Sequence, residues 1–169
     1  VAFRVAHLES PRHRAIVQRA ADEAGWGTPL PPRHGRGIAF FNGYGSQIAQ
    51  VVELSVSPAG RIRIHRVVAV IDCGLAINPS SIRAQIEGAT IDGLSTALGA
   101  SITFRRGGAQ ENDFFDYRWL RMPDSPTIDV HIVEGGSRPG GMGEVGYPAV
   151  PAAVINAVFA ATGVRPSRF

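Results

Sequence analysis

The sequence of 169 residues has little cysteine, little charge and no long apolar run. Its single cysteine, Cys73, excludes a disulfide scaffold or a zinc site built on cysteines, and leaves cytoplasm and periplasm both open. The longest apolar stretch, residues 149–161, contains Pro151 and Asn156 and is shorter than the ~18 residues that a membrane span needs. The five histidines show no metal-binding spacing, so we expect no metal held by side chains.

Charged residues make up 18% of the chain, below the roughly 25% typical of soluble domains. The formal net charge is +3, and the basic side chains are scattered rather than gathered on one element with aromatic residues between them. Nucleic-acid binding is therefore not expected. A low charge content also fits a surface that other protein covers in part.

The pattern predicts two segments, residues 1–36 and residues 37–169. In the first, Ser10-Pro11 has the form of a helix cap followed by proline at the first helical position, and Gly25 lies where that helix would end. Three prolines between residues 26 and 37 indicate an extended linker. The first segment is thus expected to be a helix joined to the remainder by a proline-rich tether.

In the second segment, β-branched residues on both sides of a turn at residues 57–60 predict a long β-hairpin over residues 48–72. A helix should follow to about Ala100, with Ser80 or Ser81 as its cap. Small residues such as Gly88 and Gly93 lower its helix propensity. They indicate that another backbone or a large cofactor lies against this helix.

The remaining pattern predicts a short hairpin near residues 102–108, a strand over residues 127–133 and a glycine-rich loop over residues 134–147. Residues 148–162 should then form a helix that is apolar nearly all round and therefore buried, ended by Gly163. This mixed order of strands and helices predicts an α+β fold.

The glycine-rich loop is the most informative segment, because Glu144 is a lone carboxylate between glycines, directly before an apolar helix. The loop lacks the Lys-Ser/Thr of a P-loop and the surroundings of a dinucleotide-binding fingerprint. A carboxylate in a dry pocket has a raised pKa and can act as a general base. The alternative is an ordinary surface glutamate beside a turn.

A second candidate is the first part of the helix at residues 80–100, where Gln85 and Glu87 are found. Glutamine can both donate and accept hydrogen bonds to a polar ligand. The alternative is an exposed first turn in which Glu87 interacts favourably with the helix dipole.

Three motifs in this order carry a family resemblance: Asp72-Cys73-Gly74 within residues 70–79, Gln85-Ile86-Glu87-Gly88-Ala89, and Gly141-Met142-Gly143-Glu144 before the last helix. Together they resemble the C-terminal part of the molybdenum-binding large subunit of the xanthine oxidase/aldehyde oxidoreductase family. The upstream segments at residues 11–14, 25–27 and 35–39 resemble its bacterial branch, typified by the isoquinoline 1-oxidoreductase beta subunit.

The resemblance implies a molybdenum hydroxylase that oxidises an N-heteroaromatic or aldehyde substrate with oxygen derived from water. Glu144 would be the general base, and Gln85 and Gly143 would contact molybdopterin, in the cytosine dinucleotide form usual in bacterial members. That family holds molybdenum through the pterin dithiolene, so no metal ligand is assigned to this chain. The [2Fe-2S] clusters that receive the electrons would belong to an iron-sulfur small subunit.

Large subunits of that family are several times longer than 169 residues. The resemblance therefore implies the C-terminal portion of a split, cleaved or longer subunit, active only with the remainder of the large subunit. The alternative is a non-catalytic α+β binding or assembly module with the same fold. The presence of Glu144 favours the enzyme, because a module that has lost activity should lose its catalytic base first.

Overall fold

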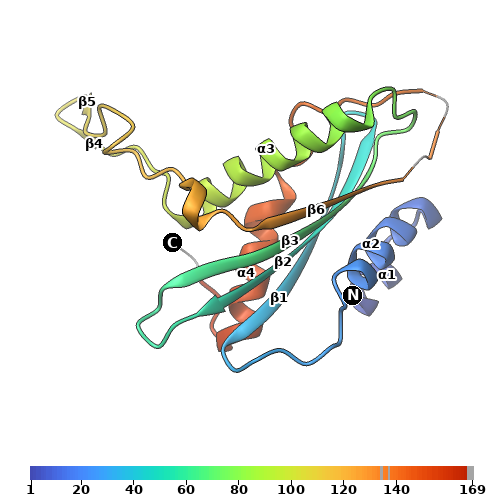
Figure 1. Cartoon of the computed structure of the whole chain (residues 1–169), viewed down its shortest axis with the longest axis horizontal. Coiled ribbons are helices and arrows are strands. Elements are labelled where there is room, and N and C mark those ends of the chain that lie inside the picture. The colour runs from blue at the N-terminus through green and yellow to red at the C-terminus, as the bar shows by residue number, and fades with distance from the viewer. Residues whose placement is uncertain (134, 137, 167–169) are drawn as a thin grey trace.

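The computed structural model describes residues 1–133, 135–136 and 138–166. Its centre is a four-stranded sheet in the order β1-β2-β3-β6 (Figure 1). β1 (His34–Gly43), β2 (Ser46–Val56) and β3 (Ile62–Asp72) are antiparallel neighbours, and β6 (Thr127–Ile132) runs parallel to β3. The hairpin and the later strand expected from the sequence are thus confirmed.

Helices cover both faces of this sheet (Figure 1). α1 (Ala2–His7) packs on α2 (Pro11–Glu23), which covers one face, while α3 (Pro79–Leu98) and α4 (Ala149–Thr162) cover the other. Val51 of β2 packs in the cluster with α2, whereas its neighbour Val52 packs in the cluster with α4. Because both faces are covered, the strands are apolar on both sides. The expected α+β fold is confirmed.

α2 begins at Pro11 and ends two residues before Gly25, as the sequence predicts. The proline-rich stretch after α2 leads into β1. The boundary that the sequence suggests, between residues 36 and 37, falls inside this strand. α2 contributes to the same core as β2 and β3. The division into two segments remains a prediction about the organisation of the chain.

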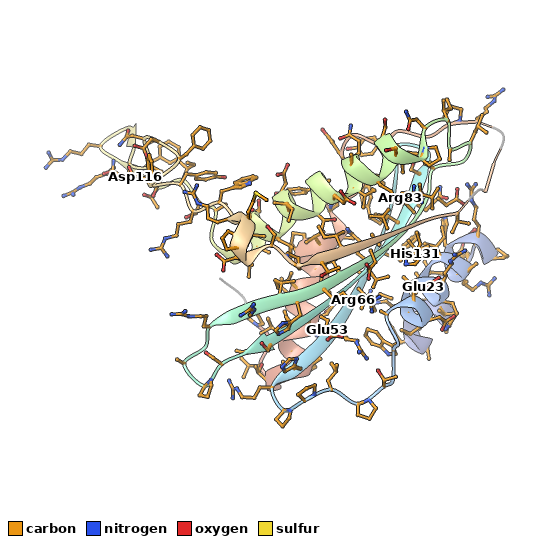
Figure 2. The ribbon with its side chains drawn as sticks, viewed as in Figure 1. Glu23, Glu53, Arg66, Arg83, Asp116 and His131 are labelled. Atoms are coloured by element: carbon orange, nitrogen blue, oxygen red, sulfur yellow. The ribbon has the colours of Figure 1, made fainter. Side chains whose placement is uncertain are left out.

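Polar contacts join α2 to the β3–β6 side of the sheet, where Figure 2 shows Glu23, Arg66 and His131 near one another. Arg66 donates to the Asp129 carboxylate at 2.6 Å and to the backbone carbonyl of Glu23 at 3.3 Å. The His131 ring nitrogen Nδ1 lies 3.5 Å from the Glu23 carboxylate. These contacts fix the end of α2 against the strands.

The cap of α3 differs from the expectation. Asn78 is the N-cap residue, and its side-chain oxygen accepts a hydrogen bond from the backbone N–H of Ser81 at 3.1 Å. Ser80 and Ser81 both lie inside the first turn, so the sequence-based cap was wrong. Asparagine caps as well as serine does, and Pro79 directly after it suits the first helical position.

A segment after α3 projects from the body of the molecule (Figure 1). It contains the small hairpin of β4 (Phe104–Arg105) and β5 (Gly108–Ala109), as expected, and returns through the short helix η1 (Met122–Asp124) to β6. In the described part of the chain, no helix combines the length and the apolar character that crossing a membrane requires.

Candidate active site

The three residues selected from the sequence line one cavity of about 500 Å³. Gln85 belongs to α3, and Gly143 and Glu144 belong to the loop that precedes α4. The lining is completed by Gly88, Ala89, Asp92, Tyr147 and Pro148. The structure therefore brings together residues that are far apart in the sequence. Glu87 is exposed on α3 and does not belong to this lining.

α3 presents a cavity-lining side and a buried side because helical residues three and four apart share a face. Gln85, Gly88 and Asp92 line the cavity, whereas Ile86 and Leu94 are buried completely. Gln85 also borders a second hollow of about 260 Å³, which Cys73, Asn78 and Met142 help to line.

The glycines of α3 serve two different purposes. A Cβ atom on Gly93 would lie 2.8 Å from Cβ of Val150 and 3.2 Å from the Tyr147 carbonyl oxygen, so α4 and the loop that precedes it approach closely. This confirms the expectation that another backbone lies against the helix. A Cβ atom on Gly88 would meet nothing within 4 Å, so that position faces open space in the cavity.

The glycine-rich loop is attached to the rest of the fold through its backbone. The N–H of Gly140 donates to the Cys73 carbonyl at 2.7 Å, and the N–H of Gly141 donates to the Tyr44 carbonyl at 2.8 Å. A Cβ atom on Gly140 would lie 2.3 Å from Oγ of Ser46, so the approach requires glycine there. Glu134 and Ser137, which belong to the predicted loop, lie outside the described residues.

The end of β3, to which this loop is attached, is fixed by a buried carboxylate. Asp72 is 1% exposed, accepts a hydrogen bond from the Gly74 N–H at 2.9 Å and pairs with Arg12 of α2 through both carboxylate oxygens. The hydrogen bond with Asp72 raises the pKa of Arg12. Asp72 thus joins α2, β3 and the backbone beside the loop.

Glu144 is exposed in the described chain, and its Oε2 accepts a hydrogen bond from the Tyr44 hydroxyl at 3.0 Å. Of the two surroundings that the sequence left open, the described residues alone give the exposed one and not a dry pocket. The same hydrogen bond and the negative charge of Glu144 raise the pKa of Tyr44. Sequence reasoning missed Tyr44, although an aromatic residue directly before Gly45 in a tight turn is unusual.

The chemistry of the lining suits an organic cofactor better than a metal ion bound by side chains. No group of three or more His, Cys, Asp or Glu residues within the described ranges could hold a metal. Within the cavity the exposed Gln85 side chain offers an amide, and a Cβ atom on Gly88 or Gly143 would meet nothing within 4 Å. The amide can donate to and accept from the polar edge of a heterocycle such as a pterin, and the missing side chains of the two glycines let such a ring approach closely.

The fold thus forms an open cavity lined by the Gln85 amide, by glycines of two segments and by two carboxylates, Asp92 and Glu144. Residues 10–126 match the family described as the molybdopterin cofactor-binding domain, and the chain belongs to this family. The matched range includes Gln85 but not Gly143 or Glu144. The roles of all three residues remain predictions.

Individual relatives show which members of this family the chain resembles. It is 33% identical over 168 residues to the beta subunit of isoquinoline 1-oxidoreductase from Brevundimonas diminuta, a match that covers 96% of this chain and 22% of that protein. It is 31% identical over 184 residues to a nicotinate dehydrogenase subunit of Pseudomonas putida, covering 98% of this chain and 16% of the relative. The expected resemblance to molybdenum-binding large subunits of the xanthine oxidase family is thereby confirmed.

The fold agrees with a solved member. The crystal structure of quinoline 2-oxidoreductase from Pseudomonas putida 86 superposes with a TM-score of 0.65 at 26% identity. The match covers 70% of this chain and 16% of that one. The chain spans 16–22% of the length of the curated relatives described above, so the activity of the whole protein is a matter for proposal.

Proposed function

We propose that this chain is the part of a molybdenum hydroxylase that carries the catalytic base, Glu144, and part of the molybdopterin-binding surface. The observation that carries the proposal is the convergence of Gln85, Gly143 and Glu144 on one cavity of about 500 Å³. Two separate segments of the chain supply these residues.

Each lining residue has a defined task in this proposal. The Gln85 amide would donate to and accept from the polar edge of the pterin, and the uncovered backbone of Gly88 and Gly143 would allow close approach. The Glu144 carboxylate would accept a proton while the substrate is oxidised. When bound, the molybdenum–pterin group supplies two-electron redox chemistry with oxygen derived from water.

The substrate would be an N-heteroaromatic compound or an aldehyde. Relatives named for isoquinoline and nicotinate support the first class. The cofactor would be the cytosine dinucleotide form of molybdopterin, and the electrons would leave through [2Fe-2S] clusters of an iron-sulfur small subunit. Activity would require the remainder of the large subunit, because this cavity is open and its glutamate is exposed.

The test is Glu144→Gln in the complete large subunit assembled with its iron-sulfur partner. Because glutamine has nearly the same shape but cannot take the proton, we expect an unchanged molybdenum content and a kcat lower by about 10²–10⁴-fold. Glu87→Gln is the matched control, since Glu87 is exposed on α3 outside the cavity lining and should retain full activity.

Two results would decide against this function. Near-normal kcat in a Glu144→Gln enzyme with full molybdenum content would refute the role of the carboxylate. Absence of molybdenum from the purified wild-type complex would refute the enzyme and support the non-catalytic binding or assembly module.

A further inference from the structure

Tyr44 stands at the tip of the β1–β2 hairpin in a backbone conformation that is uncommon for an aromatic residue. Gly43 pairs with Ser46, so Tyr44 and Gly45 form a two-residue loop, with φ of +58° and +77°. Loops with positive φ at both positions favour Asn-Gly or Gly-Gly, because a larger side chain crowds its own backbone there. A tyrosine kept at such a position points to a task for its side chain.

Core packing does not provide that task. Tyr44 is 62% exposed, and its ring lies beside Phe41 with 6.3 Å between ring centroids. Its hydroxyl instead donates to Oε2 of Glu144 at 3.0 Å, across 100 residues of sequence. The other titratable groups of the cavity are Asp92 and Tyr147, and the Tyr147 hydroxyl donates to Thr96 at 2.8 Å.

The backbone around this contact holds both partners in place. The Tyr44 carbonyl accepts from the N–H of Gly141 at 2.8 Å, and Oγ of Ser46 donates to the Gly141 carbonyl at 2.8 Å. A Cβ atom on Gly141 would lie 2.9 Å from Cβ of Tyr44, so the turn and the loop are in direct contact. Gly141, which binds the Tyr44 carbonyl, is only three residues before Glu144. The contact between turn and loop therefore holds the Tyr44 phenol close to the Glu144 carboxylate.

We propose that Tyr44 is a positioning residue for Glu144, holding Oε2 so that Oε1 is directed to the proton that the base accepts. This inference rests on the proposed function of Glu144. The hydrogen bond to Oε2 restricts the rotation of the carboxylate, so that its other oxygen keeps one orientation. Tyr44 itself is not assigned any contact with substrate or cofactor.

The first test is Tyr44→Phe in the assembled enzyme, which removes only the hydroxyl. We expect unchanged molybdenum content and a kcat lower by about 10-fold, the scale of one hydrogen bond to a charged group. Tyr117→Phe removes a phenol in the projecting segment and should change neither of these quantities.

Tyr44→Gly is the second variant, since glycine adopts positive φ without strain and the turn should persist. It should reproduce the loss of kcat. A third measurement needs no turnover: alkaline titration of tyrosine absorbance, with Tyr44→Phe identifying the Tyr44 transition. Because Glu144 raises the pKa of Tyr44, that transition should move to lower pH in Glu144→Gln.

The outcomes separate this inference from the proposed function. If Glu144→Gln abolishes turnover while Tyr44→Phe leaves kcat unchanged, the positioning role is overturned and the base is retained. A Tyr44 transition that stays at the same pH in Glu144→Gln also overturns it. Turnover that survives Glu144→Gln defeats the proposed function, whatever Tyr44→Phe shows.

Discussion

Replacing Gly37 of β1 with alanine would press a methyl group into the backbone of α4. A Cβ atom on Gly37 would lie 2.1 Å from the carbonyl oxygen of Ala153 and 2.2 Å from the amide nitrogen of Ala157. Gly35 repeats this contact, 2.3 Å from the Ala157 carbonyl and 2.6 Å from the Ala161 amide. Glycines on the strand and alanines four residues apart on the helix thus let the two backbones touch.

The cost follows from what would have to move. To restore ordinary contact distances, α4 would have to withdraw from β1 by about 1 Å, which weakens dispersion contacts along its whole buried face. Overpacking substitutions cost about 1–3 kcal/mol where side chains can adjust. The obstacles to Gly37→Ala are backbone atoms of a helix, so we expect about 3 kcal/mol or more.

The assay is thermal unfolding of the complete large subunit, following the transition that contains this domain. About 3 kcal/mol should lower Tm by roughly 6–12 °C for a domain of this size. Gly108→Ala in β5 is the control, since its Cβ atom would meet only the Arg105 carbonyl at 3.8 Å. A Gly37→Ala protein with the same Tm as the wild type would refute the argument that backbone contact holds α4 on β1.

Two further predictions concern other surfaces. Burial, followed by the charges of His34 and Arg63, lowers the pKa of His65, so the fold favours its neutral ring. The contribution of His65 to the free energy of unfolding should therefore be fully present above about pH 6.5 and should be lost as the pH falls below it. His65→Gln should lessen the difference in Tm between pH 8 and pH 5, and an undiminished difference would argue against this assignment. Phe114 and Phe115 are 81% and 90% exposed on the projecting segment, so replacing both with serine should reduce assembly with the remainder of the large subunit. The yield of complex on size-exclusion chromatography measures this, and full assembly would contradict it.

Local sequence signals were sufficient for much of the fold. Runs of β-branched residues predict the β2–β3 hairpin, and Gly163, with a φ of +74°, ends α4 as expected. The whole of β1 was missed, and Gly35 and Gly37 in its first half are poor strand formers. Their presence is explained only by the distant backbone of α4, which no local pattern contains. α1 was missed as well.

The candidate site was predictable by residue type but not by arrangement. Glu144 and Gln85 stand out through their neighbours in the sequence and through the family resemblance. Their common cavity depends on the path of the glycine-rich loop across the ends of β1 and β3, which is set by hydrogen bonds to Tyr44 and Cys73. The partner of Glu144 was missed because its only local signal is a tyrosine in a turn.

Glycine content alone also leaves the purpose of each glycine open. Gly93 and Gly146 lie where α4 and its preceding loop pack tightly on α3, whereas Gly88 and Gly143 border empty space in the cavity. The first pair brings the two segments together, and the second pair keeps the gap between them free of side chains. A cavity at this place requires both effects at once. The small residues of α3 therefore meet two requirements, one for packing at Gly93 and one for binding at Gly88. These two positions lie little more than one helical turn apart.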